Sequence, residues 1–226
     1  MKKLLHSILA VVMAGGMVSA SFADSSKLVK KALSAKAMKN DRYTFELAEN
    51  VVRERVAFHN KFGITLVGDL YTPKNAAGKM AGIVVGGSYG SVKEQVAGFY
   101  ANQMASRGFV TLAFDPSFTG DSGGEARNVT SLDINTEDFC AAVDFLSTYG
   151  GVDPEKIGAI GICGWGGIAL NAASIDTRIK ATAAITMYDM HRVMANSYND
   201  VNDNAEARKK TKEALSAHKR LSFRKT

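Results

Sequence analysis

The chain has 226 residues, with 28 lysines and arginines against 22 aspartates and glutamates, so its formal net charge is +6. Two cysteines are too few for a disulfide-rich scaffold, and this length suits one domain with an ordinary core. The positive excess is mild and lies largely near the C-terminus without interleaved aromatic residues, which argues against a nucleic-acid-binding protein.

The first 23 residues have the anatomy of a secretory signal peptide. Two lysines precede a short apolar run, and small residues occupy positions 21 and 23. The alternative is an uncleaved membrane anchor, but the apolar run is interrupted by glycines and is short for a membrane span. We therefore expect cleavage after Ala23, a mature protein without membrane contact, and a periplasmic or secreted location.

The remaining chain predicts a single α/β core. Residues 24–50 look like a polar helical leader, and residues 51–73 alternate apolar and polar side chains around a glycine-bearing turn, which predicts a hairpin. Downstream, apolar runs suited to buried strands alternate with segments of helical spacing. The strand segments are 80–87, 109–115, 157–162 and 179–189, and the helical segments are 91–108, 131–150 and 166–175. This alternation predicts a mainly parallel sheet with an antiparallel N-terminal hairpin and helices on both faces.

Three unusual segments follow predicted strands: 86–91 (GGSYGS), 115–124 (DPSFTGDSGG) and 163–167 (CGWGG). The carboxyl ends of parallel strands meet at one edge of a sheet, so we expect these segments to converge on one site. GGSYGS lacks the spacing of a phosphate-binding loop, and no histidine pair or cysteine cluster has the spacing of metal ligands. Neither a cofactor nor a metal is expected.

Residues 152–167 (VDPEKIGAIGICGWGG) combine a strand, a sharp turn, glycines and the start of a helix. This order resembles the nucleophile elbow of the α/β-hydrolase superfamily. With the hairpin, the glycine pair after the first parallel strand and the FDxxxxGxSxG loop, residues 51–192 look most like its dienelactone-hydrolase-like and acetyl-esterase-like members. The resemblance implies an α/β-hydrolase core that lacks its last strands, is C-terminally incomplete, and continues into a helical basic tail at 193–226 that fits a truncated insertion.

The resemblance assigns roles to residues at the elbow and at the loop facing it. Cys163 stands where the nucleophile belongs, and the backbone N–H of Gly164 would be one oxyanion-hole donor. The second donor would be the main-chain N–H of Ser88 or Tyr89. A helix N-terminus favours the thiolate form of a cysteine. A second alignment of the motif, shifted by two residues, remains open. In this register Trp165 occupies the position of the nucleophile, and the site has no nucleophile.

The acid and the histidine of this superfamily follow the nucleophile in the chain. Asp189 and His191 are the candidates near the expected site, and the alternative is that both are surface residues. Trp165, Asp115 and Ser117 are candidate lining residues of a substrate pocket, although Asp115 could instead cap main-chain N–H groups.

Cys140 falls on the apolar stripe of a predicted helix, which favours a buried free thiol. A Cys140–Cys163 disulfide is the alternative in an exported protein.

These observations predict an exported hydrolase that cleaves an ester, thioester or lactone of a small acyl substrate. The alternative is a catalytically inactive remnant or a binding module. An open sheet edge would also make self-association possible.

Overall fold

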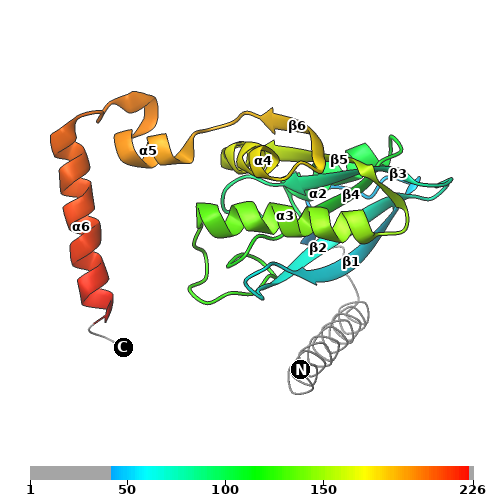
Figure 1. The fold of residues 1–226 in the computed structure, drawn as a ribbon, viewed down its shortest axis with the longest axis horizontal. Helices are drawn as coiled ribbons and strands as arrows, with labels where there is room; N and C mark the ends of the chain where they lie inside the picture. Colours follow the sequence, from blue (N-terminus) through cyan, green and yellow to red (C-terminus); the bar gives the residue numbers. More distant parts are fainter. Residues whose placement is uncertain (1–41, 224–226) are drawn as a thin grey trace, which may run out of the picture.

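A computed structural model describes residues 42–223 of the chain (Figure 1). The predicted signal peptide, 1–23, and most of the predicted leader lie outside the described residues. The described end of that leader, 43–50, consists of bends, turns and irregular chain, so this part of the helical prediction is wrong. Within 42–223, no helix combines the length and the apolar character needed to span a bilayer.

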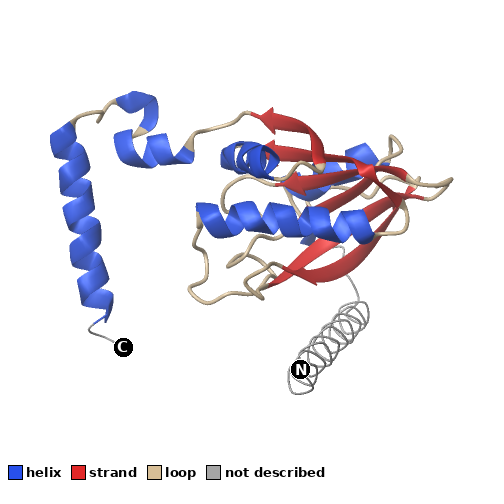
Figure 2. Ribbon diagram, viewed as in Figure 1, coloured by secondary structure: helices blue, strands red, loops and turns tan. Residues whose placement is uncertain are grey.

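Six strands form one mixed sheet in the order β1-β2-β4-β3-β5-β6 (Figure 2). The pairs β1–β2 and β2–β4 are antiparallel, and the pairs β4–β3, β3–β5 and β5–β6 are parallel. The strands are β1 (Val51–His59), β2 (Thr65–Pro73), β3 (Met80–Gly86), β4 (Val110–Phe114), β5 (Val152–Ile162) and β6 (Ile179–Ile185). The predicted fold class and the predicted hairpin are therefore confirmed.

Helices cover both faces of this sheet. Helix α2 (Val96–Ala105) packs on one face, and α3 (Leu132–Thr148) and α4 (Gly164–Ile175) pack on the other. The chain continues into α5 (Met190–Asn196), a 3-10 turn, η2 (Tyr198–Asp200), and α6 (Ala205–Phe223). Figure 1 shows that α6 lies apart from the sheet. The described residues of α6 are mostly exposed.

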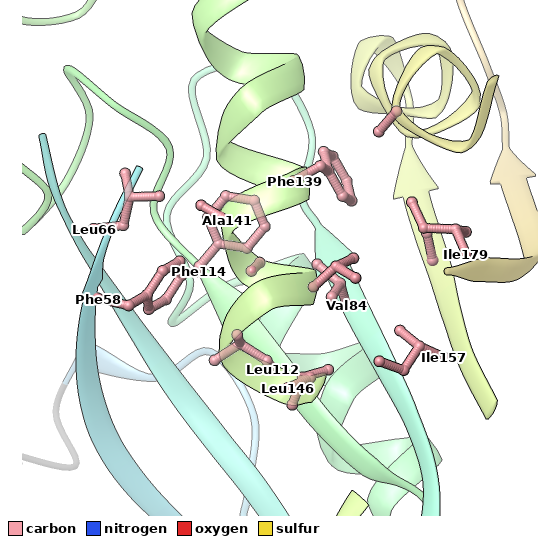
Figure 3. Close-up of a cluster of buried hydrophobic side chains, with 14 of the residues drawn as sticks. Phe58, Leu66, Val84, Leu112, Phe114, Phe139, Ala141, Leu146, Ile157 and Ile179 are labelled. Atoms are coloured by element: carbon pink, nitrogen blue, oxygen red, sulfur yellow. The ribbon is translucent and has the colours of Figure 1, made fainter. Parts of the chain in front are cut away.

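The larger core lies between the sheet and the pair α3 and α4. Phe114 from β4 meets Phe139 from α3 edge to face, with ring centroids 5.5 Å apart (Figure 3). Phe58 from β1 meets Phe114 at 6.3 Å, so one aromatic run joins the hairpin to the parallel strands. Aromatic pairs of this geometry add stabilisation beyond the area they bury.

Strand β6 differs from its prediction as a strand buried on both faces. Ile179 is buried, but Lys180, Ala181, Ala183 and Ala184 are exposed. Among the described residues β6 pairs only with β5, so its other edge meets no strand. An apolar run predicts a buried strand only when neighbours exist on both sides to bury it.

Candidate active site

The chain reverses sharply at Cys163, between the end of β5 and the start of α4. Cys163 has φ 58° and ψ −130°. Residues other than glycine rarely adopt a positive φ of this size. Its N–H donates to the Ile185 carbonyl at 2.9 Å, and its own carbonyl accepts from Gly166 N at 3.0 Å and Tyr188 N at 3.4 Å. These hydrogen bonds to α4 and to the chain around β6 hold the strained residue in place.

Gly161 allows β5 and α4 to approach each other at this turn. A Cβ atom at Gly161 would lie 2.3 Å from the Trp165 carbonyl oxygen and 2.7 Å from the Ala169 Cβ. Such distances exclude any side chain, which explains the small residue two positions before Cys163. The strand, turn and helix geometry predicted from the sequence is therefore present.

Trp165 lies in the core, so its prediction as a pocket residue is wrong. Its side chain is 4% exposed, and its ring lies 5.8 Å from that of Phe139 and 6.2 Å from that of Phe114. The second position of α4 faces the interior of the layer between sheet and helices, and an indole fills that space. The backbone reversal falls at Cys163 and not at Trp165, which favours the register that starts from Cys163.

The loop after β3 faces the elbow from the other side of the turn. A Cβ at Gly164 would lie 2.5 Å from two ring carbons of Tyr89, so this ring is packed directly on the first residue of α4. The Ser88 carbonyl accepts from Ser91 N at 3.1 Å and from Ser91 Oγ at 2.8 Å. No described residue accepts a hydrogen bond from the backbone N–H of Ser88, Tyr89 or Gly164. These three donors are the ones that an oxyanion hole would use.

Both thiols are free, so the disulfide alternative is wrong. Cys140 lies on α3, where burial, with a smaller contribution from the charge of Asp176, raises the pKa of its thiol to about 11. Cys163 is half-buried beside Tyr89, and burial followed by the proximity of the Cys163 sulfur raises the pKa of that phenol. Both cysteines are half-buried, and of the two Cys163 is the one placed at a strained turn.

His191 and Asp189 lie in the neighbourhood of the elbow, at the cavity that Gly164 also lines. Both line a cavity of about 360 Å³ whose wall also includes Gly164, Gly167 and Tyr188. The Asp189 carboxylate caps α5 by accepting from Arg192 N at 3.0 Å. Within the described part of the chain, no hydrogen bond or ion pair joins His191 or Asp189 to Cys163. The structure thus brings the two residues to one cavity beside the first residues of α4.

Asp115 and Ser117 are buried and bonded within the protein, which contradicts their prediction as lining residues of the pocket at the elbow. Ser117 is fully buried and donates through its N–H and its hydroxyl to Asp138, at 2.8 Å each. Asp115 is also fully buried and accepts from Lys93 Nζ at 2.7 Å. Asp115 borders a separate hollow of about 230 Å³ with Lys93 and Asp121, so its expected capping role is the better description.

Lys93 is the residue that sequence reasoning missed. It is 1% exposed, and its ammonium group also lies 2.8 Å from Asp121 and 3.0 Å from Glu94. The predicted helix at 91–108 would place Lys93 and Glu94 on a solvated face, but α2 begins only at Val96. No local sequence signal indicates this burial, because the main partner of Lys93, Asp115, lies 22 residues further along the chain.

Comparisons with known proteins agree with this geometry. Residues 34–201 match the model of the PET hydrolase-like family. The chain is 61% identical to the uncharacterized protein PA2218 of Pseudomonas aeruginosa over 158 residues, which is 70% of this chain and 43% of that protein. It is 32% identical to the thiohydrolase aneE of Aspergillus aculeatus over 137 residues, covering 61% of this chain and 42% of that protein.

Solved structures show the same fold. The crystal structure of PA2218 superposes with a TM-score of 0.81 at 54% identity, covering 84% of this chain and 59% of that one. Acetyl xylan esterase 1 from Thermoanaerobacterium shares the fold at 19% identity, with a TM-score of 0.55 over 71% of this chain and 57% of that one. The chain spans about half or less of the length of the first curated relatives it matches.

Proposed function

Since the chain belongs to the PET hydrolase-like family and has the α/β-hydrolase fold, we propose that it hydrolyses a small acyl ester, thioester or lactone with Cys163 as the nucleophile. The observation that carries this proposal is the left-handed Cys163 at the head of α4. A non-glycine residue is held in this conformation mainly where a sharp turn must present its side chain. An acetyl xylan esterase and a thiohydrolase are among the proteins similar to this chain, which supports the same class of reaction.

The proposed reaction has two covalent steps. The Cys163 thiolate attacks the carbonyl carbon, a carbon–sulfur bond forms, and the alkoxide or thiolate leaving group departs with a proton. Water then attacks the acyl-cysteine, releasing the acid and restoring the thiol. The free N–H groups of Gly164 and of Ser88 or Tyr89 stabilise the oxyanion that develops in each step. His191 is the proposed proton carrier with Asp189 as its acidic partner, because among described histidine side chains His191 lines the cavity beside Gly164.

The test compares hydrolysis of a p-nitrophenyl acyl ester by four proteins: the unchanged chain, Cys163→Ser, Cys163→Ala and Cys140→Ala. We expect Cys163→Ala to abolish turnover and Cys140→Ala to leave it unchanged, because Cys140 lies on α3, outside the turn at the head of α4, and its thiol has a raised pKa. Turnover that survives Cys163→Ala would end the proposal that this cysteine is the nucleophile.

A binding module without catalysis is the second candidate function. One observation favours it: within residues 42–223, no hydrogen bond or ion pair joins Cys163 to either of the two proposed triad partners. Absence of hydrolysis together with saturable binding of an acyl ester, measured by calorimetry, would support this candidate over the first.

We also propose that the protein is exported and that residues 1–23 are removed. Mass spectrometry of the protein recovered from the periplasm or medium should then give a chain that begins at Asp24. A cytoplasmic product that begins at Met1 would contradict export.

A further inference from the structure

The segment 87–95 joins β3 to α2 and carries two of the three free backbone donors. Its first end is fixed by the pairing of Gly86 with Gly161 of β5. In its middle, Ser91 closes a turn onto the Ser88 carbonyl, and Gly90 has φ +75°. The position of this turn therefore depends on how the second end of the segment is held.

Lys93 holds that second end through both its main chain and its side chain. Its backbone N–H donates to Asp115 Oδ1 at 2.7 Å, and its ammonium group donates to Asp115 Oδ2 at 2.7 Å. A single carboxylate therefore fixes the position and the direction of the chain at Lys93.

Asp115 is itself held rigidly at the end of β4. The Asp121 N–H donates to Asp115 Oδ2 at 2.9 Å, and a Cβ at Gly120 would lie 2.2 Å from the same oxygen. The loop 115–124 thus wraps closely around this carboxylate. Asp115 directly follows β4, and because β4 pairs with β3 and β3 pairs with β5, this carboxylate is attached to the same sheet that carries the elbow.

Lys93 stays charged in this environment. Burial alone would lower the pKa of Lys93, but the charge and hydrogen bond of Asp115 raise it. The contacts with Asp121 and Glu94 at 2.8 and 3.0 Å add two further carboxylates around the ammonium group. A buried charge held by such partners is costly to place, and breaking its pairs leaves uncompensated carboxylates.

We propose that Lys93 and Asp115 are positioning residues for the oxyanion hole, because together they fix the backbone N–H groups of Ser88 and Tyr89 relative to Gly164. This inference rests on the proposed hydrolase function. The merely structural alternative is that the pair stabilises the fold and has no separate effect on the reaction.

The experiment compares Lys93→Met and Asp115→Asn with the matched control Asp69→Asn. Asp69 is fully buried in the same group of charges, where it accepts from Arg55 at 3.0 Å and from Tyr43 at 2.7 Å. Within the described residues no hydrogen bond or ion pair joins Asp69 directly to the segment 87–95, to which it is linked through the pair of Arg55 with Glu94. For each folded variant, kcat and KM for a p-nitrophenyl ester are measured beside the free energy of unfolding in urea. Asp115→Asn keeps the side-chain volume and an acceptor for the Lys93 N–H, so it serves if Lys93→Met fails to fold.

The proposal predicts that kcat of Lys93→Met falls on the order of 10²-fold with KM nearly unchanged, which is the loss typical of one misplaced oxyanion donor. Asp115→Asn should show a smaller loss of kcat, and Asp69→Asn should lose stability while kcat stays within about twofold. If Lys93→Met, Asp115→Asn and Asp69→Asn have equal kcat values and differ only in their free energy of unfolding, the positioning role would be overturned.

Hydrogen exchange separates this inference from the proposed function. Lys93→Met should speed amide exchange in a peptide covering 87–92 more than Asp69→Asn does, whether or not the unchanged chain hydrolyses esters. If neither the unchanged protein nor any variant shows turnover that depends on Cys163, the hydrolase proposal fails, and the exchange measurement still tests the positioning inference. Unchanged exchange in 87–92 would overturn the inference that Lys93 fixes this segment.

Discussion

Replacing Trp165 by alanine tests whether the elbow is built on a packed aromatic core. The indole is 4% exposed and contacts the rings of Phe139 and Phe114. A buried tryptophan removes roughly 200 Å² from water, which at ~25 cal/mol per Å² gives an upper value of about 5 kcal/mol. Because a cavity would remain between Phe139 and Phe114, we expect a loss of about 3–5 kcal/mol in the free energy of unfolding.

The assay is urea denaturation followed by far-UV circular dichroism, because Trp165 is the sole tryptophan and its fluorescence disappears with it. Trp165→Phe keeps an aromatic ring in the core and should cost less than about 2 kcal/mol, so it serves if the alanine variant does not fold. The control is Phe62→Ala, at a position that is 54% exposed in the hairpin turn, where we expect a change within about 0.5 kcal/mol.

A loss below about 1 kcal/mol for Trp165→Ala would refute this reasoning. The indole would then have to be solvated, and the register with Trp165 at the exposed position of the turn would again be open. A large loss in Trp165→Ala without a comparable loss in Phe62→Ala supports the register that starts from Cys163.

Three further predictions concern the thiols, the sheet edge and pH. Iodoacetamide at pH 8 should alkylate Cys163 well before Cys140, because the pKa of the Cys140 thiol is raised to about 11, and equal labelling in peptide mass spectra would contradict that raised pKa. We propose that copies associate through the open edge of β6, so Ala183→Lys, which puts a charge on that edge, should raise the monomer fraction in sedimentation; an unchanged distribution argues against this edge. Burial alone would raise the pKa of Asp121, but the hydrogen bond and charge of Lys93 lower it below the unfolded value. The Asp121 carboxylate therefore stabilises the fold above about pH 4, and this stabilisation is lost as the pH falls through the pKa of the folded state. Asp121→Asn should therefore flatten the dependence of unfolding free energy on pH below 4, and an unaltered slope would show that the ion pair contributes nothing.

The elements that sequence reasoning predicted well are those whose pattern is local. The hairpin at 51–73 follows from alternation of apolar and polar residues, and the elbow follows from a buried strand that runs into Cys163 and glycines. Gly161 could be assigned from spacing alone, because only the absence of a side chain permits the close approach of β5 and α4. In each case one segment contains the whole signal.

The misses arise where the outcome depends on partners that are distant in sequence. Lys93 and Asp115 are 22 residues apart, and charged residues ordinarily indicate solvated surface, so their burial as a pair could not be predicted. The composition of β6 predicts burial, but burial also requires a neighbouring strand. Trp165 was misplaced for the same reason, since the cavity that it fills is formed by α3 and β4.

The backbone angle at Cys163 implies that the fold tolerates a local conformational cost at the point where chemistry is proposed. A residue with a Cβ held in such a region costs of order 1–3 kcal/mol, and glycine largely avoids this cost. Cys163→Gly should therefore raise the midpoint of thermal unfolding while it removes the sulfur. The cysteine therefore lowers stability at the same turn where we propose that the reaction takes place.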